Sequence, residues 1–193
     1  MPAAGAESDL NRSTRHRLPG DPAPADEIAR MLRVDHAGEF GAVRIYDGQL
    51  AVLGNTGRMA AEIRRMAAAE EHHLAVFAAL LRERRVRPTL LQPLWSAMGY
   101  ALGAATALLG ERAAMACTVA VEEVIDDHYQ AQAEYLAVED PSLAETVRAC
   151  RADEIAHRRT ALAHGAEQAP GYELLTGAIR AGSRLAIWLS TRL

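Results

Sequence analysis

The 193-residue sequence lacks the marks of several common protein classes. Aromatic residues make up only 5% of it, and alanine and leucine supply much of its apolar content, which favours helices over sheets. Its two cysteines, Cys117 and Cys150, form no CxxC pair, which excludes a zinc knuckle or a rubredoxin-type centre and favours buried free thiols in a reducing compartment. The net charge of -4 excludes an overall basic footprint, so we expect no nucleic-acid partner.

The N-terminal stretch has no apolar segment of the kind found in a secretory signal. It contains arginine and serine, but Glu7 and Asp9 argue against a transit peptide. We therefore expect a disordered leader over residues 1–23 and one domain over residues 24–193. No stretch predicts a clean membrane span, because the charge-free residues 88–110 are interrupted by proline and glycine.

Apolar residues recur at helical spacing along most of the chain, and no strand pattern competes with them. The helices that this spacing predicts cover about residues 24–53, 58–86, 111–138, 141–164 and 172–193. The connections between the first four are short, long and short, which is the connectivity of a ferritin-like four-helix bundle. The sequence thus predicts an all-α fold with a long apolar crossover and an additional C-terminal amphipathic helix.

Six ionisable residues fall at positions that the helical spacing assigns to the core. They are Glu39, Glu70, His73, Glu122, Glu154 and His157. An unpaired buried carboxylate costs several kcal/mol or changes its protonation, and the helices offer no matching set of buried arginines. Bound cations are the simplest compensation. For any single residue a solvated face is the better interpretation, but all six in one register favour a metal site.

The spacing of these residues sharpens the prediction. Glu70–His73 and Glu154–His157 are Glu-x-x-His motifs, whose members share one face of a helix. Glu39 and Glu122 each precede one motif by about thirty residues, as in the di-iron and di-manganese bundles. Oxygen and nitrogen ligands without thiolate suit iron or manganese.

In both halves of the chain a helix with one glutamate is followed by a helix with a Glu-x-x-His motif. This repeated order also predicts how the ligands are divided between two metals. We expect Glu70 and Glu154 to bridge them. Glu39 and His73 should complete one position, and Glu122 and His157 the other. Two ferrous ions held side by side could each give electrons to one O2.

Residues beside the motifs are more ambiguous. Tyr129 lies seven residues after Glu122 and returns to the ligand face, where it could line the pocket, pass electrons or simply pack in the core, and the role of His128 is equally open. Asp35 lies one turn before Glu39 and could orient His73 or His157. Glu71 and His72 are expected to point away from the site.

The charge-free crossover allows two interpretations. It could be a buried connecting helix, or it could contact a membrane surface with Trp95 and Tyr100 as interfacial anchors. Together with the amphipathic C-terminal helix, it favours an enzyme that lies on a membrane.

Three stretches of the sequence resemble one family. They are RVDHAGEFGAVRIYDGQLAVLG (33–54), VRPTLLQPLWSAMGYALGAATALLG (86–110) and AMACTVAVEEVIDDHYQAQ (114–132). They look like the demethoxyubiquinone hydroxylases, which are ferritin-like di-iron carboxylate proteins, and the likeness covers roughly residues 26–193. The family's metal-ligand pattern falls on all six residues named above, with no ligand missing.

The resemblance implies a monooxygenase of ubiquinone biosynthesis. It would hydroxylate the ring of a polyprenylated demethoxyubiquinol with O2, giving demethylubiquinol, and would hold two Fe ions per chain. An electron donor (NADH or the quinol itself) and other proteins of ubiquinone synthesis are the expected partners. The family's His-Tyr pair matches His128 and Tyr129 and is associated there with the entry of electrons.

The resemblance further implies a peripheral enzyme, which for a bacterial form would lie on the cytoplasmic side of the cell inner membrane. Two other functions fit the residues alone. One is a di-iron hydroxylase acting on another substrate, such as a tRNA base, and the other is an iron-storage protein of the ferritin type.

Overall fold

The computed structural model describes residues 20–193 of the chain, so part of the expected leader lies outside the described residues. The described part is helical throughout. Its helices are α1 (Pro24–Leu53), α2 (Arg58–Glu83), α3 (Gln92–Leu108), α4 (Glu111–Glu139), α5 (Pro141–Ala163) and α6 (Tyr172–Ser190), with a short 3-10 turn at Ala166–Gln168. The prediction of an all-α bundle with a crossover and an additional C-terminal helix is confirmed.

The helix ends follow from local sequence signals. The start of α5 is capped by Asp140, whose Oδ1 accepts a hydrogen bond of 3.1 Å from the backbone N–H of Leu143, with Pro141 at the first helical position. Arg84 lies 2.7 Å from the other carboxylate oxygen and ties the end of α2 to this cap. The apolar spacing predicts that α2 ends near Val86, but it ends at Glu83 because Arg85 takes a left-handed backbone conformation with a φ of 56°.

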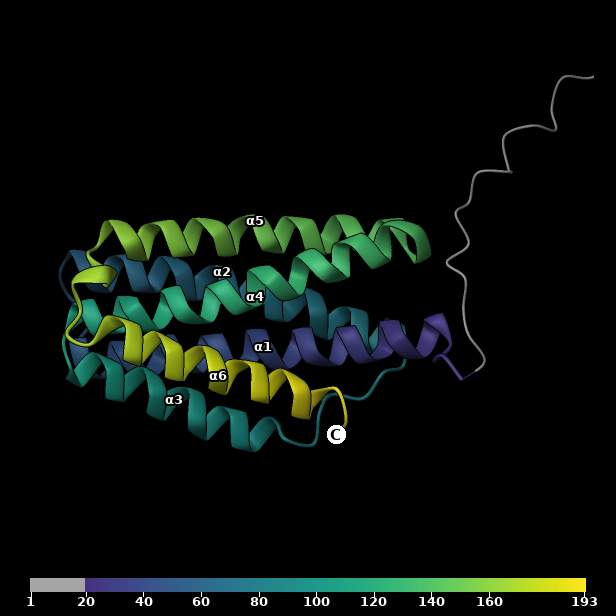
Figure 1. The fold of residues 1–193 in the computed structure, drawn as a ribbon, viewed down its shortest axis with the longest axis horizontal. Coiled ribbons are helices and arrows are strands. Elements are labelled where there is room, and N and C mark those ends of the chain that lie inside the picture. Colours follow the sequence, from purple (N-terminus) through teal and green to yellow (C-terminus); the bar gives the residue numbers. More distant parts are fainter. Residues whose placement is uncertain (1–19) are drawn as a thin grey trace, which may run out of the picture.

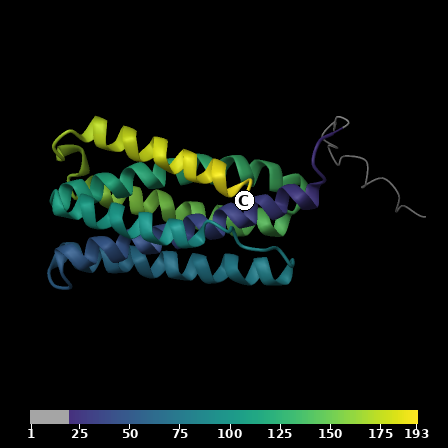
Figure 2. The ribbon, with the colours of Figure 1, turned by 90° about the horizontal axis from the view of Figure 1, so that it is seen from below.

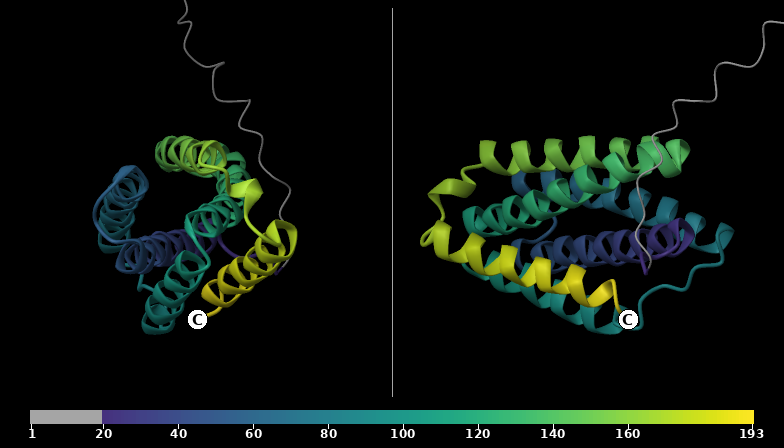
Figure 3. Two further views of the ribbon diagram at one scale, coloured as in Figure 1. Left: turned by 90° about the vertical axis from the view of Figure 1, so that its left-hand side faces the viewer. Right: turned by 45° about the vertical axis from the view of Figure 1, so that its right-hand side comes forward.

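The six helices run lengthwise along the molecule (Figure 1) and lie in three layers of two helices each. Viewed along the bundle in Figure 3, α1 and α4 form the middle pair, with α2 and α5 on one side and α3 and α6 on the other. Figure 2 shows α2 and α6 at opposite edges of the bundle. The expected four-helix bundle is therefore α1, α2, α4 and α5, and the crossover helix joins α6 in covering its outer face.

Glycines bring α3 unusually close to α1. A Cβ on Gly103 would overlap the backbone carbonyl of Ile45, and one on Gly99 would lie 2.8 Å from the carbonyl oxygen of Gly41. Gly48 makes the reciprocal approach from α1 to the backbone of α3. Only glycine permits such contact between helix backbones, so α3 packs directly against the helix that carries Glu39.

Two apolar clusters fill the ends of the bundle. One contains Leu32, Phe77 and Leu136, and the other contains Ile63 and Met115, all at most 1% exposed. The six predicted ligands occupy the middle of the bundle between these clusters.

The crossover does not present its tryptophan as expected. Trp95 is only 8% exposed and donates its indole N–H to Ser190 Oγ at 3.1 Å, because the end of α6 lies against it. The prediction that Trp95 is an exposed interfacial anchor is therefore wrong, whereas Tyr100 is 38% exposed. Among residues 20–193, no helix is both long and apolar enough to cross a membrane.

Candidate metal centre

The middle of the bundle brings all six predicted ligands together. Each comes from the inward face of its helix, and none is more than 8% exposed. They are Glu39 from α1, Glu70 and His73 from α2, Glu122 from α4, and Glu154 and His157 from α5. Glu71 and His72 are exposed, as predicted from their positions off the core face.

The six side chains form two overlapping groups. In each group, one ligand atom from every member lies within 4.8 Å of the others. The first group is Glu39, Glu70, His73 and Glu154, and the second is Glu70, Glu122, Glu154 and His157. Glu70 and Glu154 belong to both groups, the arrangement expected of carboxylates shared by two cations.

The shared carboxylates face both imidazoles. Glu70 places Oε1 at 2.9 Å from Nδ1 of His157 and Oε2 at 3.7 Å from Nδ1 of His73. Glu154 places Oε1 at 3.3 Å from Nδ1 of His73 and Oε2 at 3.6 Å from Nδ1 of His157. Each of these carboxylates therefore directs one oxygen into each group.

Among the described residues, the inward atoms of the site have no hydrogen-bond partner outside the site and face only one another. They are both carboxylate oxygens of Glu70 and of Glu154, Oε2 of Glu39 and of Glu122, and Nδ1 of His73 and of His157. Leaving such an atom buried without a hydrogen bond costs about 1–3 kcal/mol. Eight unsatisfied atoms facing one small volume fit two bound cations, and the donor set of carboxylates and imidazoles suits iron or manganese.

Two tyrosines complete the ligand layer crosswise. Tyr46 of α1 donates its hydroxyl hydrogen bond to Oε1 of Glu122 on α4, at 3.0 Å. Tyr129 of α4 donates in turn to Oε1 of Glu39 on α1. Tyr129 thus lies at the site, as its return to the ligand face predicts. The role of Tyr46 was missed, although it follows Glu39 by the same seven residues that separate Tyr129 from Glu122.

The electrostatics show how the site behaves without metal. Burial raises the pKa of Glu39 and of Glu122 well above the ordinary carboxyl value. Burial would raise the pKa of Glu154 too, but contacts with His157 and His73 outweigh it and lower that pKa to about 2. Burial would lower the pKa of both imidazoles, but the carboxylates around them raise the pKa of His157 to about 9 and that of His73 still further. Without metal, the site therefore holds its charge balance with protons.

Asp153 lies behind His73. Its Oδ2 is 3.0 Å from Nε2 of His73, on the side of the ring away from the carboxylates. The expectation that Asp35 orients His73 or His157 is wrong. Asp35 lies on the part of α1 that faces α4, where its Oδ1 accepts a 2.7 Å hydrogen bond from Gln132.

His128 lies beside the site rather than in it. Its Nε2 is 3.4 Å from Oδ1 of Asp35 and 2.8 Å from Nε2 of Gln132. His128 and Gln132 also line a polar pocket of about 830 Å³, whose wall includes Arg30, Arg33 and Arg192. The structure therefore connects His128 to an arginine-lined pocket, while its neighbour Tyr129 reaches the ligands.

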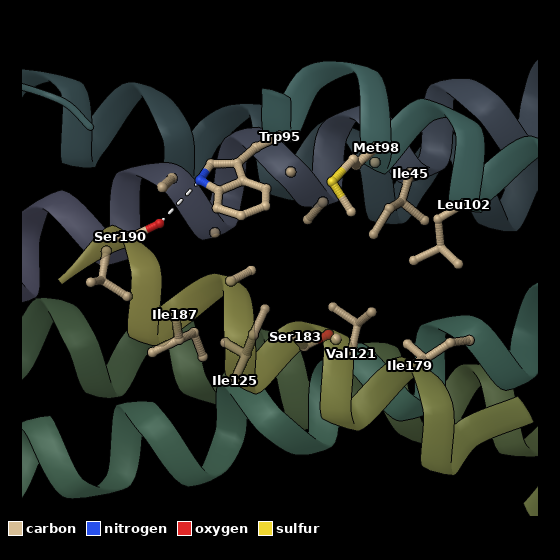
Figure 4. A pocket seen from close by; sticks show the side chains of 18 of the residues that line it. Ile45, Trp95, Met98, Leu102, Val121, Ile125, Ile179, Ser183, Ile187 and Ser190 are labelled. Atoms are coloured by element: carbon tan, nitrogen blue, oxygen red, sulfur yellow. Dashed lines mark hydrogen bonds between the residues drawn. The ribbon is translucent and has the colours of Figure 1, made fainter. Parts of the chain in front are cut away.

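A second, apolar pocket adjoins the polar one on the same side of α1 and α4, and Val34 lines both. Its volume is about 430 Å³, and Figure 4 shows Ile45, Trp95 and Leu102 pointing into it, with Ile187 also in its wall. Gly38 and Val121, which directly precede Glu39 and Glu122, also line it. The apolar pocket therefore shares the α1 and α4 segments that carry the two unshared glutamates.

Comparison with known proteins identifies the family. The family model described as "Ubiquinone biosynthesis protein COQ7" matches residues 26–190. The chain belongs to this family. The resemblance inferred from the sequence is confirmed, and the family is one of ferritin-like di-iron proteins.

Relatives from distant organisms share most of the chain. The 3-demethoxyubiquinol 3-hydroxylase of Rhodospirillum rubrum is 55% identical over 181 residues, which are 94% of this chain and 85% of that protein. The mitochondrial NADPH-dependent 3-demethoxyubiquinone 3-hydroxylase of Homo sapiens is 51% identical over 170 residues, 86% of this chain and 78% of that protein. The mitochondrial 5-demethoxyubiquinone hydroxylase of Saccharomyces cerevisiae is 40% identical over 187 residues, 89% of this chain and 80% of that protein.

Proposed function

We propose that this chain is a di-iron monooxygenase that hydroxylates the ring of a polyprenylated demethoxyubiquinol with O2, giving demethylubiquinol in ubiquinone biosynthesis. The observation that carries the proposal is the convergence of eight buried, unpartnered ligand atoms in a member of the COQ7 family. The reaction replaces a ring C–H with C–OH, and the second oxygen atom leaves as water, which takes up two electrons and two protons.

Two irons fit the ligand arrangement. We assign Glu70 and Glu154 as bridging ligands, Glu39 and His73 to one iron, and Glu122 and His157 to the other, since this division matches the two overlapping groups. A bound iron pair supplies the redox chemistry that ring hydroxylation by O2 requires. The protein's part is to orient the carboxylates, which the hydrogen bonds from Tyr46 to Glu122 and from Tyr129 to Glu39 support.

The apolar pocket suits the quinol. Its wall of aliphatic side chains and Trp95 offers little to a charged ligand but accommodates a ring with an isoprenoid chain (Figure 4). Because it shares the α1 and α4 segments that carry Glu39 and Glu122, a ring bound there lies beside the proposed iron site.

Electrons could enter through the polar pocket. Three arginines in its wall favour an anionic donor such as a nicotinamide dinucleotide, and His128 and Tyr129 lead from that pocket to Glu39. The relatives from Homo sapiens and Mus musculus are named as NADPH-dependent hydroxylases, which supports a nicotinamide donor over the quinol itself. Replacing Tyr129 with Phe should slow reduction of the loaded enzyme while the bound iron is retained.

We also propose that the enzyme lies on the cytoplasmic side of the cell inner membrane. Support comes from apolar side chains on the outer face of α3 and α6, where Leu94, Met98, Leu185 and Trp188 are 46–56% exposed. A peripheral position there would let a lipid-dissolved quinol enter between the two helices, directly or from another ubiquinone-synthesis protein.

Complementation tests the reaction. The chain should restore ubiquinone in cells that accumulate the demethoxy precursor, and Glu70→Ala should fail to do so and lose the bound iron pair. Glu71→Ala is the matched control, because it removes the exposed neighbouring carboxylate and should behave as the wild type. Iron loading into a soluble 24-subunit cage without quinol hydroxylation would instead indicate an iron-storage protein.

The apolar pocket and the membrane contact can be tested separately. Gly182 lines the pocket and has open space around it, so Gly182→Leu should fill the pocket and reduce hydroxylation without unfolding the chain. Gly177→Leu on the same helix lies outside the pocket and serves as its control. Liposome flotation should weaken in a Leu94→Glu, Leu185→Glu variant and be unchanged in Leu162→Glu on α5.

A further inference from the structure

The ligand layer of the site repeats with internal twofold symmetry. Four correspondences define the repeat: Glu39 with Glu122, Tyr46 with Tyr129, Glu70 with Glu154, and His73 with His157. The symmetric tyrosine hydrogen bonds extend the equivalence beyond the ligands themselves. On these contacts alone, the two metal positions would bind their cations equally.

The symmetry is broken behind the imidazoles. Asp153, the residue before Glu154, places its carboxylate 3.0 Å from the outer nitrogen of His73. The corresponding residue on α2, directly before Glu70, is Ala69. Within the described part of the chain, no carboxylate contacts the outer nitrogen of His157, whose contacts all run through Nδ1.

An outer carboxylate strengthens a metal-binding histidine. It accepts the hydrogen of the outer ring nitrogen, fixes the tautomer and the ring orientation, and makes the inner nitrogen a better donor. Losing such a partner typically costs 10–100-fold in metal affinity. The Asp153 side chain is 58% exposed, so solvent screening places the effect near the lower end, at about tenfold.

We propose that the two metal positions are unequal and that Asp153 is the positioning residue responsible. The position of Glu39 and His73 binds its cation first and more tightly, and that of Glu122 and His157 fills second. This inference rests on the proposed two-metal site, since it concerns how that site fills. It also predicts that placing a carboxylate at residue 69 would equalise the two positions.

The test is a titration of the metal-free, full-length protein with Co²⁺, followed by visible absorption and by competition with a chelator. The wild type should show two steps whose dissociation constants differ by about twelve-fold, the separation expected of two independent positions whose affinities differ tenfold, against the statistical factor of about four for two identical positions. Asp153→Ala should weaken the first step by about fivefold, change the second by no more than about twofold and bring the ratio near four.

Two further variants separate positioning from charge. Ala69→Asp should tighten the second step by about fivefold, a gain that a merely structural role for Asp153 would not produce. Glu71→Ala removes a nearby exposed charge without touching either imidazole and should leave both steps unchanged. Thermal unfolding of each metal-free variant checks that the bundle is intact.

The outcomes distinguish this inference from the site itself. Two bound ions with only the statistical separation, or equal weakening of both steps in Asp153→Ala, would overturn the inequality while leaving the two-metal site in place. A wild-type protein that binds fewer than two ions would overturn the site and the inequality together.

Discussion

Metal binding to the six-ligand site should displace about four protons at neutral pH. Two are carboxyl protons held by Glu39 and Glu122, whose pKa values burial raises well above the ordinary range. Two are imidazolium protons on His73 and His157, whose pKa values are raised by the surrounding carboxylates, that of His157 to about 9. Two divalent cations bring four positive charges and four protons leave, so the charge of the site stays the same.

Calorimetry can count these protons. Titrating the metal-free protein with Mn²⁺ at pH 7 in buffers of different ionisation enthalpy yields the number released as the slope of observed heat against that enthalpy. The summed free energy of binding the two ions should become more favourable by about 5.4 kcal/mol per pH unit near neutrality, which corresponds to the release of four protons. Glu71→Gln should release as many protons as the wild type, and Glu122→Gln about one fewer. Release of fewer than about two protons would refute the proposed charge balance.

The same shifts set the pH dependence of the metal-free protein. The pKa of His157 is raised on folding, so its contribution to stability is present below about pH 6.5 and is lost as the pH rises through about 9. Glu154 has the opposite sign, because its pKa is lowered to about 2 and its contribution is lost only in acid. Urea unfolding should therefore show metal-free protein weakening between pH 6.5 and 9, and saturating Mn²⁺ should remove that decline.

Three further predictions concern the scaffold. Gly103→Ala should lower the free energy of unfolding by about 1–3 kcal/mol in a urea titration, because its new methyl group would overlap the backbone of α1. Gly177 has open space around it, so Gly177→Ala should raise the free energy of unfolding by up to about 1 kcal/mol in the same titration. Cys117 and Cys150 should not react with iodoacetamide in the folded protein at pH 8, since burial raises both thiol pKa values to about 12, and fast labelling would contradict their placement. Asp140→Ala should cost about 1 kcal/mol through loss of the α5 cap, and an unchanged melting temperature would argue against that hydrogen bond.

Much of the fold and the ligand set could be predicted from the sequence because helical spacing is a local property. Residues three or four apart share a helix face whatever lies across from them, so Glu70 and His73, or Glu154 and His157, could be paired from spacing alone. The crosswise tyrosines were also within reach, since Tyr46 follows Glu39 by the interval that separates Tyr129 from Glu122. The sequence by itself thus determined the helices, the connectivity and the four carboxylates and two imidazoles directed inward.

Only the tertiary structure decided which groups meet across helices. Spacing places Asp35 on the helix that carries Glu39, but the rotation of α1 turns it toward Gln132, and the carboxylate behind His73 comes from Asp153 on α5. The amphipathic side chain of Trp95 suits both a buried position and a membrane surface, so the sequence does not decide between them. Its burial depends on where the end of α6 lies. Contacts of this kind depend on how the helices rotate and cross. Side-chain packing between segments that are distant in the sequence sets those angles, so the pattern of a single helix does not contain them.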